Sequence, residues 1–204
     1  MDINQDVIPT ERCASAFGRM FWAFLFFLDF RIGINNVHVD ILPDFIGWIM
    51  IGSALATILD LSPRVVGIRT LASWLVFLSL FDLVEIRIPL SRSGAFTTWT
   101  TPTFPIGIIA AVLGILLIWK LCGLIIDMAR IAGDTAISSR AAFRRKLYVA
   151  LVVVLTITVA ISFVAPPFIL VAIVLGLPLA VIVFCLMMGL MRGTENMCRG
   201  FRIS

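Results

Sequence analysis

The 204-residue chain is 61% hydrophobic and 14% charged, whereas soluble domains are about half apolar and about one quarter charged. Its apolar residues fall in long runs, which are typical of chains that span a lipid bilayer and exclude a soluble globular domain. The net charge of +4 does not indicate binding of nucleic acid, because no basic run is interleaved with aromatic residues, as single-strand binding requires.

Six apolar runs predict an all-α polytopic integral membrane protein with six transmembrane helices. A helix needs about 20 residues to cross a hydrocarbon core of about 30 Å. The N-terminus lacks the basic start and small-residue cleavage site of a signal peptide, so we expect the first run to be retained. The predicted spans cover about 17–34, 45–59, 71–88, 105–121, 147–164 and 168–191. They form one membrane domain, residues 1–204, of three hairpins at about 17–60, 71–121 and 147–191.

A weak internal similarity relates the hairpins. The segment F-L-F-F-L-D-F-R around Asp29 resembles F-L-S-L-F-D-L-V around Asp82. Repeats that each contain an even number of helices are parallel copies, related by an axis along the membrane normal. The alternative is a chance match between apolar sequences.

The distribution of basic residues predicts the orientation. The predicted outer side holds only three arginines, Arg31, Arg87 and Arg92, and Lys120 lies near the inner end of the fourth span. Because basic residues gather in cytoplasmic loops, we expect both termini in the cytoplasm and the chain in the inner, or plasma, membrane. No cysteine falls in an outer loop, so no disulfide framework is expected there. The inner side holds Arg12, Arg19, Arg64, Arg69, Arg130, Arg140, Arg144, Arg145, Lys146, Arg192, Arg199 and Arg202.

Residues 121–146 form the largest inner segment. Leu121, Leu124, Ile125 and Met128 recur at helical spacing, which predicts an amphipathic extension of the fourth helix along the inner membrane surface. We expect this helix to end near Gly133.

Six charged residues near the outer ends of the first three spans form the candidate functional cluster. Because charges at membrane depth are costly, we expect them to face the bundle and to pair. They form either a polar vestibule for a cation or small polar substrate, or an ion-pair lock between helices. The lock is favoured because buried charges usually pair structurally. The cluster comprises Asp29, Arg31, Asp44, Asp82, Glu85 and Arg87.

Three other features are interpreted as structural. His38, in a polar turn near Asp40, is interpreted as solvated rather than as a metal ligand or pH sensor. Pro178 is expected to kink the sixth helix. Small residues allow helix backbones to approach, and we interpret those of the fourth helix as packing contacts: Gly107, Ala110, Ala111 and Gly114.

Established catalytic motifs are absent from the sequence. There is no G-x-S-x-G, H-E-x-x-H, Walker A or G-x-G-x-x-G motif, and no cysteine or histidine spacing typical of zinc. We therefore expect a protein that is not an enzyme and has no cofactor or metal.

The segment D-I-L-P-D-F-I-G-W-I-M-I-G, from Asp40 to Gly52, resembles a motif of a known group. Small, uncharacterised multi-pass bacterial membrane proteins carry an apolar-Asp run followed by D-I-L-P-D-x-I-G. The resemblance covers the first hairpin, about a quarter of the chain. It implies a bacterial inner-membrane protein and assigns no role to Asp40 or Asp44.

Two functions are consistent with these patterns. The first is a scaffold or subunit that acts through contacts with other membrane proteins, or with copies of itself, in the bilayer. The second is a small transporter or channel whose outer mouth is the charged cluster. The first is favoured because the middle of the predicted spans carries few polar side chains, and a pathway for ions needs some.

Overall fold

The computed structural model describes residues 10–27, 31–34, 37–40, 44–80, 84–86, 103–162, 174 and 176–200. Within them the chain forms six α-helices and one three-stranded sheet. The helices are α1 (Thr10–Ala23), α2 (Asp44–Ala56), α3 (Pro63–Ser79), α4 (Thr103–Ile131), α5 (Thr135–Ser162) and α7 (Leu177–Gly200). The strands are β1 (Arg31–Ile34), β2 (Val37–Asp40) and β3 (Val84–Ile86). The predicted helical class is confirmed, and the small sheet is added to it.

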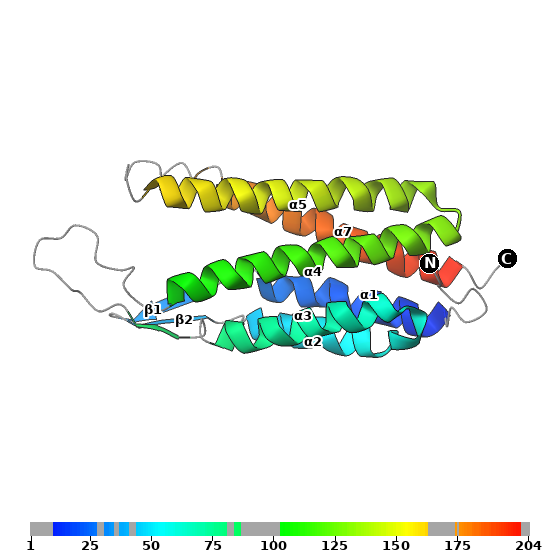
Figure 1. Ribbon diagram of the computed structural model, residues 1–204, viewed down its shortest axis with the longest axis horizontal. Coiled ribbons are helices and arrows are strands. Elements are labelled where there is room, and N and C mark those ends of the chain that lie inside the picture. Colours follow the sequence, from blue (N-terminus) through cyan, green and yellow to red (C-terminus); the bar gives the residue numbers. More distant parts are fainter. Residues whose placement is uncertain are drawn as a thin grey trace, which may run out of the picture.

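The helices run up and down along one elongated bundle (Figure 1). Each packs against its neighbours in sequence, and α7 also packs against α1, so the six helices form a closed ring. The start of α1, the end of α7 and the α4–α5 connection lie together at what we call the terminal end (Figure 1). The strands lie at the opposite end, the sheet end.

The sheet corrects the predicted ends of two spans. The first span was predicted to continue as helix to Ile34, but α1 ends at Ala23, a 3₁₀ turn covers Phe24–Phe27, and Arg31–Ile34 is a strand. The third was predicted to reach residue 88, but α3 ends at Ser79 and Val84–Ile86 is a strand. Both runs have a high mean hydropathy. The mean does not show where the spacing of apolar residues changes from that of a helix to that of a strand.

The register of the sheet explains why these residues form strands. Arg31 lies opposite Asp40, and His38 lies opposite both Gly33 and Glu85. In the sequence of the strands, Arg31, His38, Asp40 and Glu85 alternate with isoleucine and valine, which is the two-residue period of a strand. A helical period would mix the two sets.

The α4–α5 connection is a tight turn that ends one helix and starts the next. Gly133 adopts φ 72°, a left-handed conformation that favours glycine at the end of a helix. The Asp134 N–H donates to the Ala129 carbonyl at 2.8 Å, and the Asp134 carboxylate accepts from the Ile137 N–H at 2.9 Å. The helix end predicted near Gly133 is confirmed.

The apolar stripe beyond residue 121 does not lie on a membrane surface. Leu121, Ile125 and Met128 are buried in the core of the bundle, within an unbroken α4. Residues 135–146 begin α5, which packs antiparallel against α4 (Figure 1). The prediction of a helix was correct, but its apolar stripe packs against other helices and not against a membrane surface.

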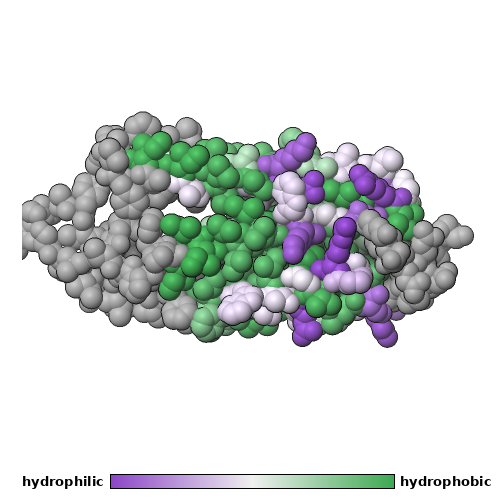
Figure 2. Space-filling model, in the orientation of Figure 1, coloured by the Kyte–Doolittle hydropathy of each residue, from purple (hydrophilic) through white to green (hydrophobic). Residues whose placement is uncertain are grey.

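The outer surface of the bundle is apolar over most of its length. Figure 2 shows hydrophobic residues along the bundle and hydrophilic residues toward the terminal end. Trp74, Ile109 and Val154, on three different helices, are each more than half exposed, at 57%, 51% and 56%. A water-soluble helix would carry polar side chains at such positions.

Exposed hydroxyl groups on the helices bond to their own backbone. Thr70 donates to the Val66 carbonyl, Thr156 to Val152 and Thr158 to Val154, at 3.0, 2.8 and 2.8 Å. This arrangement satisfies the hydroxyls without water. It suits side chains that face lipid, where no other partner is present.

Two helices among the described residues, Ile106–Ile131 and Pro178–Gly200, are long and apolar enough to cross a membrane. Only 39% and 33% of their most apolar windows are buried inside the protein. The core helix of a soluble protein would be mostly buried. The helix Asp44–Ala56 is apolar but shorter.

The first and last helices meet at the terminal end through a pair of free cysteines. The Sγ atoms of Cys13 in α1 and Cys198 in α7 are 2.8 Å apart, and both side chains are fully buried. The hydrogen bond to Cys198, and then burial, raise the pKa of the Cys13 thiol. The thiol therefore stays protonated at neutral pH.

We expect an added oxidant to join this pair. With copper phenanthroline and air, the two thiols would lose two protons and two electrons to oxygen and form a disulfide, since their positions are within reach of one another. Non-reducing electrophoresis after proteolysis should show the N- and C-terminal fragments linked. Cys13→Ser should remove the link and Cys185→Ser should leave it. A link that persists in Cys13→Ser would contradict the α1–α7 contact.

Candidate functional site

The six residues of the predicted cluster are divided among three kinds of place. Asp29, Asp82 and Arg87 lie outside the described residues. Arg31 and Glu85 lie in β1 and β3 of the small sheet. Asp44 is the first residue of α2 and lines a cavity inside the ring.

The sheet brings together the outer ends of the first and third predicted spans. β2 lies between β1 and β3, so Arg31 and Glu85 belong to one small sheet although they are far apart in sequence. The backbone of His38, predicted as a solitary turn residue, lies in β2 opposite Glu85. The turn prediction was therefore wrong at His38, and its interpretation as solvated stays a prediction.

A cavity of about 350 Å³ lies within the ring, toward the sheet end. Five helices and the 3₁₀ turn contribute to its wall, which is mostly apolar. Small-molecule sites have this character, with a few polar groups in an apolar wall. The wall consists of Phe24, Phe27, Asp44, Trp48, Leu75, Leu78, Ser79, Ile106, Gly107, Ala110, Ala111, Gly114, Ile118, Tyr148, Val152 and Phe184.

Three polar side chains reach this wall from three helices. Asp44 lies in the first turn of α2, where the helix dipole favours a negative charge. The Ser79 hydroxyl donates to the Val76 carbonyl at 3.0 Å, so its oxygen still has acceptor capacity. Tyr148 of α5 supplies a phenol. A carboxylate with a phenol nearby can hold a cation or accept hydrogen bonds from a small polar molecule.

The small residues of α4 also line the cavity. Gly107, Ala110, Ala111 and Gly114 were interpreted as helix-packing contacts, and all four line the cavity. A Cβ atom on Gly114 would lie 3.7 Å from the Tyr148 hydroxyl, and one on Gly107 would meet nothing within 4 Å. Large side chains at these positions would occupy the cavity. The small residues therefore keep it open.

Close aromatic packing forms the floor of the cavity. The rings of Phe27 and Trp48 lie 4.2 Å apart, and Phe27 also contacts Phe184 of α7 with centroids 6.3 Å apart. These contacts join α2, α7 and the 3₁₀ turn. They give the cavity a rigid wall, because aromatic side chains lose little freedom on packing.

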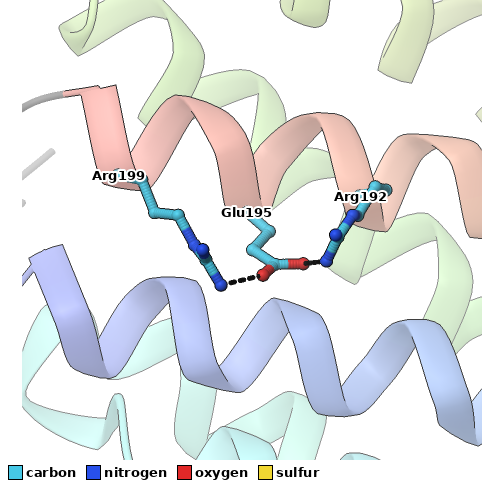
Figure 3. Close-up of polar contacts among 3 residues, drawn as sticks. All are labelled: Arg192, Glu195 and Arg199. Carbon is cyan, nitrogen blue, oxygen red and sulfur yellow. Dashed lines mark hydrogen bonds and ion pairs between the residues drawn. The ribbon is translucent and has the colours of Figure 1, made fainter.

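An ion-pair cluster with a buried carboxylate lies within α7 at the terminal end (Figure 3). Both Glu195 carboxylate oxygens accept hydrogen bonds, one from Arg192 at 2.6 Å and one from Arg199 at 2.5 Å. The Glu195 side chain is 3% exposed, whereas the arginine side chains are 58% and 66% exposed. A Cβ atom on Gly18 of α1 would lie 3.3 Å from the carboxylate carbon. Glycine there lets the carboxylate pack against α1.

The sequence contained a signal for this cluster. Glu195 lies three residues after Arg192 and four before Arg199, spacings at which side chains meet on a helix. The two arginines were predicted only as markers of orientation. Tyr148 gave no such signal, because its place in the cavity depends on the closure of the ring.

The described residues contain no group of histidine, cysteine or carboxylate side chains arranged to hold a metal ion. The chain matches no protein-family model, no curated protein and no solved structure. The resemblance of the first hairpin therefore stays a prediction.

Proposed function

We propose that the protein is a six-span inner-membrane protein without catalytic activity, a scaffold or subunit that binds other membrane proteins through its helices. The observation that carries this proposal is the broad apolar surface around the ring, on α3, α4, α5 and α7. Association within lipid uses van der Waals contact between such surfaces. The charges of the terminal end fit the positive-inside rule, with both termini in the cytoplasm.

The internal polar contacts support a structural use of charge. Arg64 of α3 pairs with Asp127 of α4 at 2.6 Å, and Arg19 of α1 donates to the Thr57 hydroxyl at 3.3 Å. Each of these two contacts joins different elements of the ring, whereas the Glu195 ion pairs lie within α7. This is the arrangement expected of a stable platform.

A site-specific photo-crosslinker tests the proposal in cells. Placed at Trp74, Ile109 or Val154, which are exposed, it should give a discrete protein adduct from at least one helix face. The same group at Leu121, which is fully buried, serves as the control and should give none. Lipid adducts alone at every exposed position would contradict the proposal.

A second candidate function, a small transporter or channel, is favoured by the cavity. Its volume and its carboxylate would suit a cation or a small polar substrate that enters from the outer side. Transport pathways are commonly marked by ionisable residues within the membrane. In this candidate function, Asp44 lines the transport pathway and the small residues of α4 keep the pathway wide.

We expect Asp44→Asn to separate the two candidates. If the carboxylate serves transport, the variant should give normal folded yield and a cation flux lowered about tenfold or more, because the binding charge is lost. Flux is measured in vesicles with an entrapped ion-sensitive dye. Asp60→Asn, which changes an exposed carboxylate outside the cavity, is the control and should leave the flux unchanged. Equal flux from wild-type vesicles and empty vesicles would exclude transport of the ions tested.

A further inference from the structure

A second cavity, of about 610 Å³, lies at the terminal end between α3, α4 and α5. Three arginines and one aspartate line it, so its net charge is +2: Arg64, Arg130, Arg145 and Asp127. We call it the basic groove. It is separate from the apolar cavity near Asp44 and shares no lining residue with it.

Not all the positive charge of the groove is neutralised. The Asp127 carboxylate already forms a salt bridge with Arg64, with an N–O distance of 2.6 Å. Among the described residues, no carboxylate pairs with Arg130 or Arg145. Clustered arginines without counter-charges repel one another, and this cost is repaid when an anion binds between them.

Arg145 is held in place for such an anion. Its guanidinium carbon lies 4.0 Å from the ring centroid of Trp119, a cation–π contact that fixes the orientation of the planar group. Its Nε atom is buried and has no hydrogen-bond partner in the part of the chain that the structure describes. Buried donors are normally satisfied, so the guanidinium lacks a full set of protein acceptors, and its other N–H groups, in the lining of the groove, suit a ligand with several acceptor oxygens.

Hydroxyl groups extend the donor set. Thr135 and Ser138, in the first turn of α5, line the groove beside the arginines. Three arginines and two hydroxyls suit a tetrahedral oxyanion better than a planar carboxylate, because a phosphate offers acceptors in several directions.

The position of the groove indicates where the phosphate comes from. The groove adjoins Trp119, which is 43% exposed, near the predicted inner end of the fourth span. Aromatic residues gather at the headgroup level of a bilayer, and basic pockets between helices on the cytoplasmic side bind anionic headgroups.

We propose that the basic groove binds a phosphate group, supplied by the headgroup of an anionic phospholipid in the inner leaflet. Only the source of the phosphate rests on the proposed membrane placement. Arg130 and Arg145 hold the charge, Trp119 orients Arg145, and Ser138 adds a hydrogen bond. The apolar surface beside the groove accommodates the acyl chains.

Lipid titration of the full chain in neutral detergent tests the proposal. Native mass spectrometry should show phosphatidylglycerol bound more tightly than phosphatidylcholine, which has no net charge. Arg130→Gln with Arg145→Gln should weaken phosphatidylglycerol on the order of tenfold, from the loss of two charges near a headgroup. Arg140→Gln, an exposed arginine of α5 outside the groove, should not.

Further arms of the titration keep the outcome decisive. If the double variant fails to fold, Arg130→Gln alone changes only an exposed side chain and should weaken binding in the same direction. Displacement of the lipid by millimolar inorganic phosphate would support the groove and make free phosphate its ligand. No preference for phosphatidylglycerol, or an equal loss in Arg140→Gln, would overturn the proposal. A chain soluble without detergent would instead overturn the membrane placement, and the titration would then use inorganic phosphate alone.

Discussion

Gly47→Ala is expected to destabilise the protein by about 2 kcal/mol, the cost of overpacking a tight helix contact. A Cβ atom at this position would lie 2.6 Å from Phe27 Cε1 and 2.9 Å from the Ala23 carbonyl oxygen. The ring could move, but the backbone oxygen belongs to the end of α1 and cannot yield without shifting the helix. The result is measured as a lowered thermal transition of the purified chain in detergent.

Gly52 provides the matched control in the same helix. A Cβ atom there would lie 3.8 Å from the Ala72 Cβ, an ordinary contact. Gly52→Ala should therefore be neutral or stabilise by up to about 1 kcal/mol, because alanine favours a helix over glycine. Equal effects from the two substitutions would show that α1 and α2 do not approach as closely as described.

Glu195→Ala should also cost about 2 kcal/mol, through the loss of two charge-assisted hydrogen bonds. The figure is lower than for a fully buried pair, because both arginines are more than half exposed and water screens their charge. The substitution would also leave a space beside Gly18, which lowers stability further. Thermal denaturation in detergent measures the change.

Two other substitutions test whether the stability loss comes from the hydrogen bonds of Glu195. Glu195→Gln keeps the shape and one acceptor, so it should lose about half as much stability. Asp60→Ala removes an exposed carboxylate in the 3₁₀ turn Leu59–Leu61 and should change stability by less than about 0.5 kcal/mol. A Glu195→Ala variant as stable as wild type would mean that the cluster in Figure 3 contributes nothing to the α1–α7 contact.

The sequence predicts the helices better than it predicts their ends. Each of the six apolar runs overlaps one described helix, because hydropathy reports the long runs directly. The strands were missed because the isoleucine and valine residues of Arg31–Ile34 and Val84–Ile86 directly follow the apolar runs of the first and third predicted spans. Their two-residue alternation is visible in the letters, and only the period distinguishes them from helix.

The candidate site was predicted only in part. Asp44 was identified from its place after Pro43 at a helix start, and it lines the cavity. Tyr148 and the open face of α4 were not identified, because which helix faces surround a cavity depends on how the ring closes. Hydropathy and spacing describe one helix at a time. The inner stripe of α4 was assigned to a membrane surface for the same reason.

Alkaline carbonate extraction of membranes from cells that express the chain tests the placement of these helices in lipid most directly. High pH releases proteins bound to a membrane surface and leaves those whose helices cross the bilayer. We predict that the full chain stays in the membrane pellet and needs detergent to become monodisperse. Release into the supernatant, as a monodisperse protein without detergent, would contradict the account.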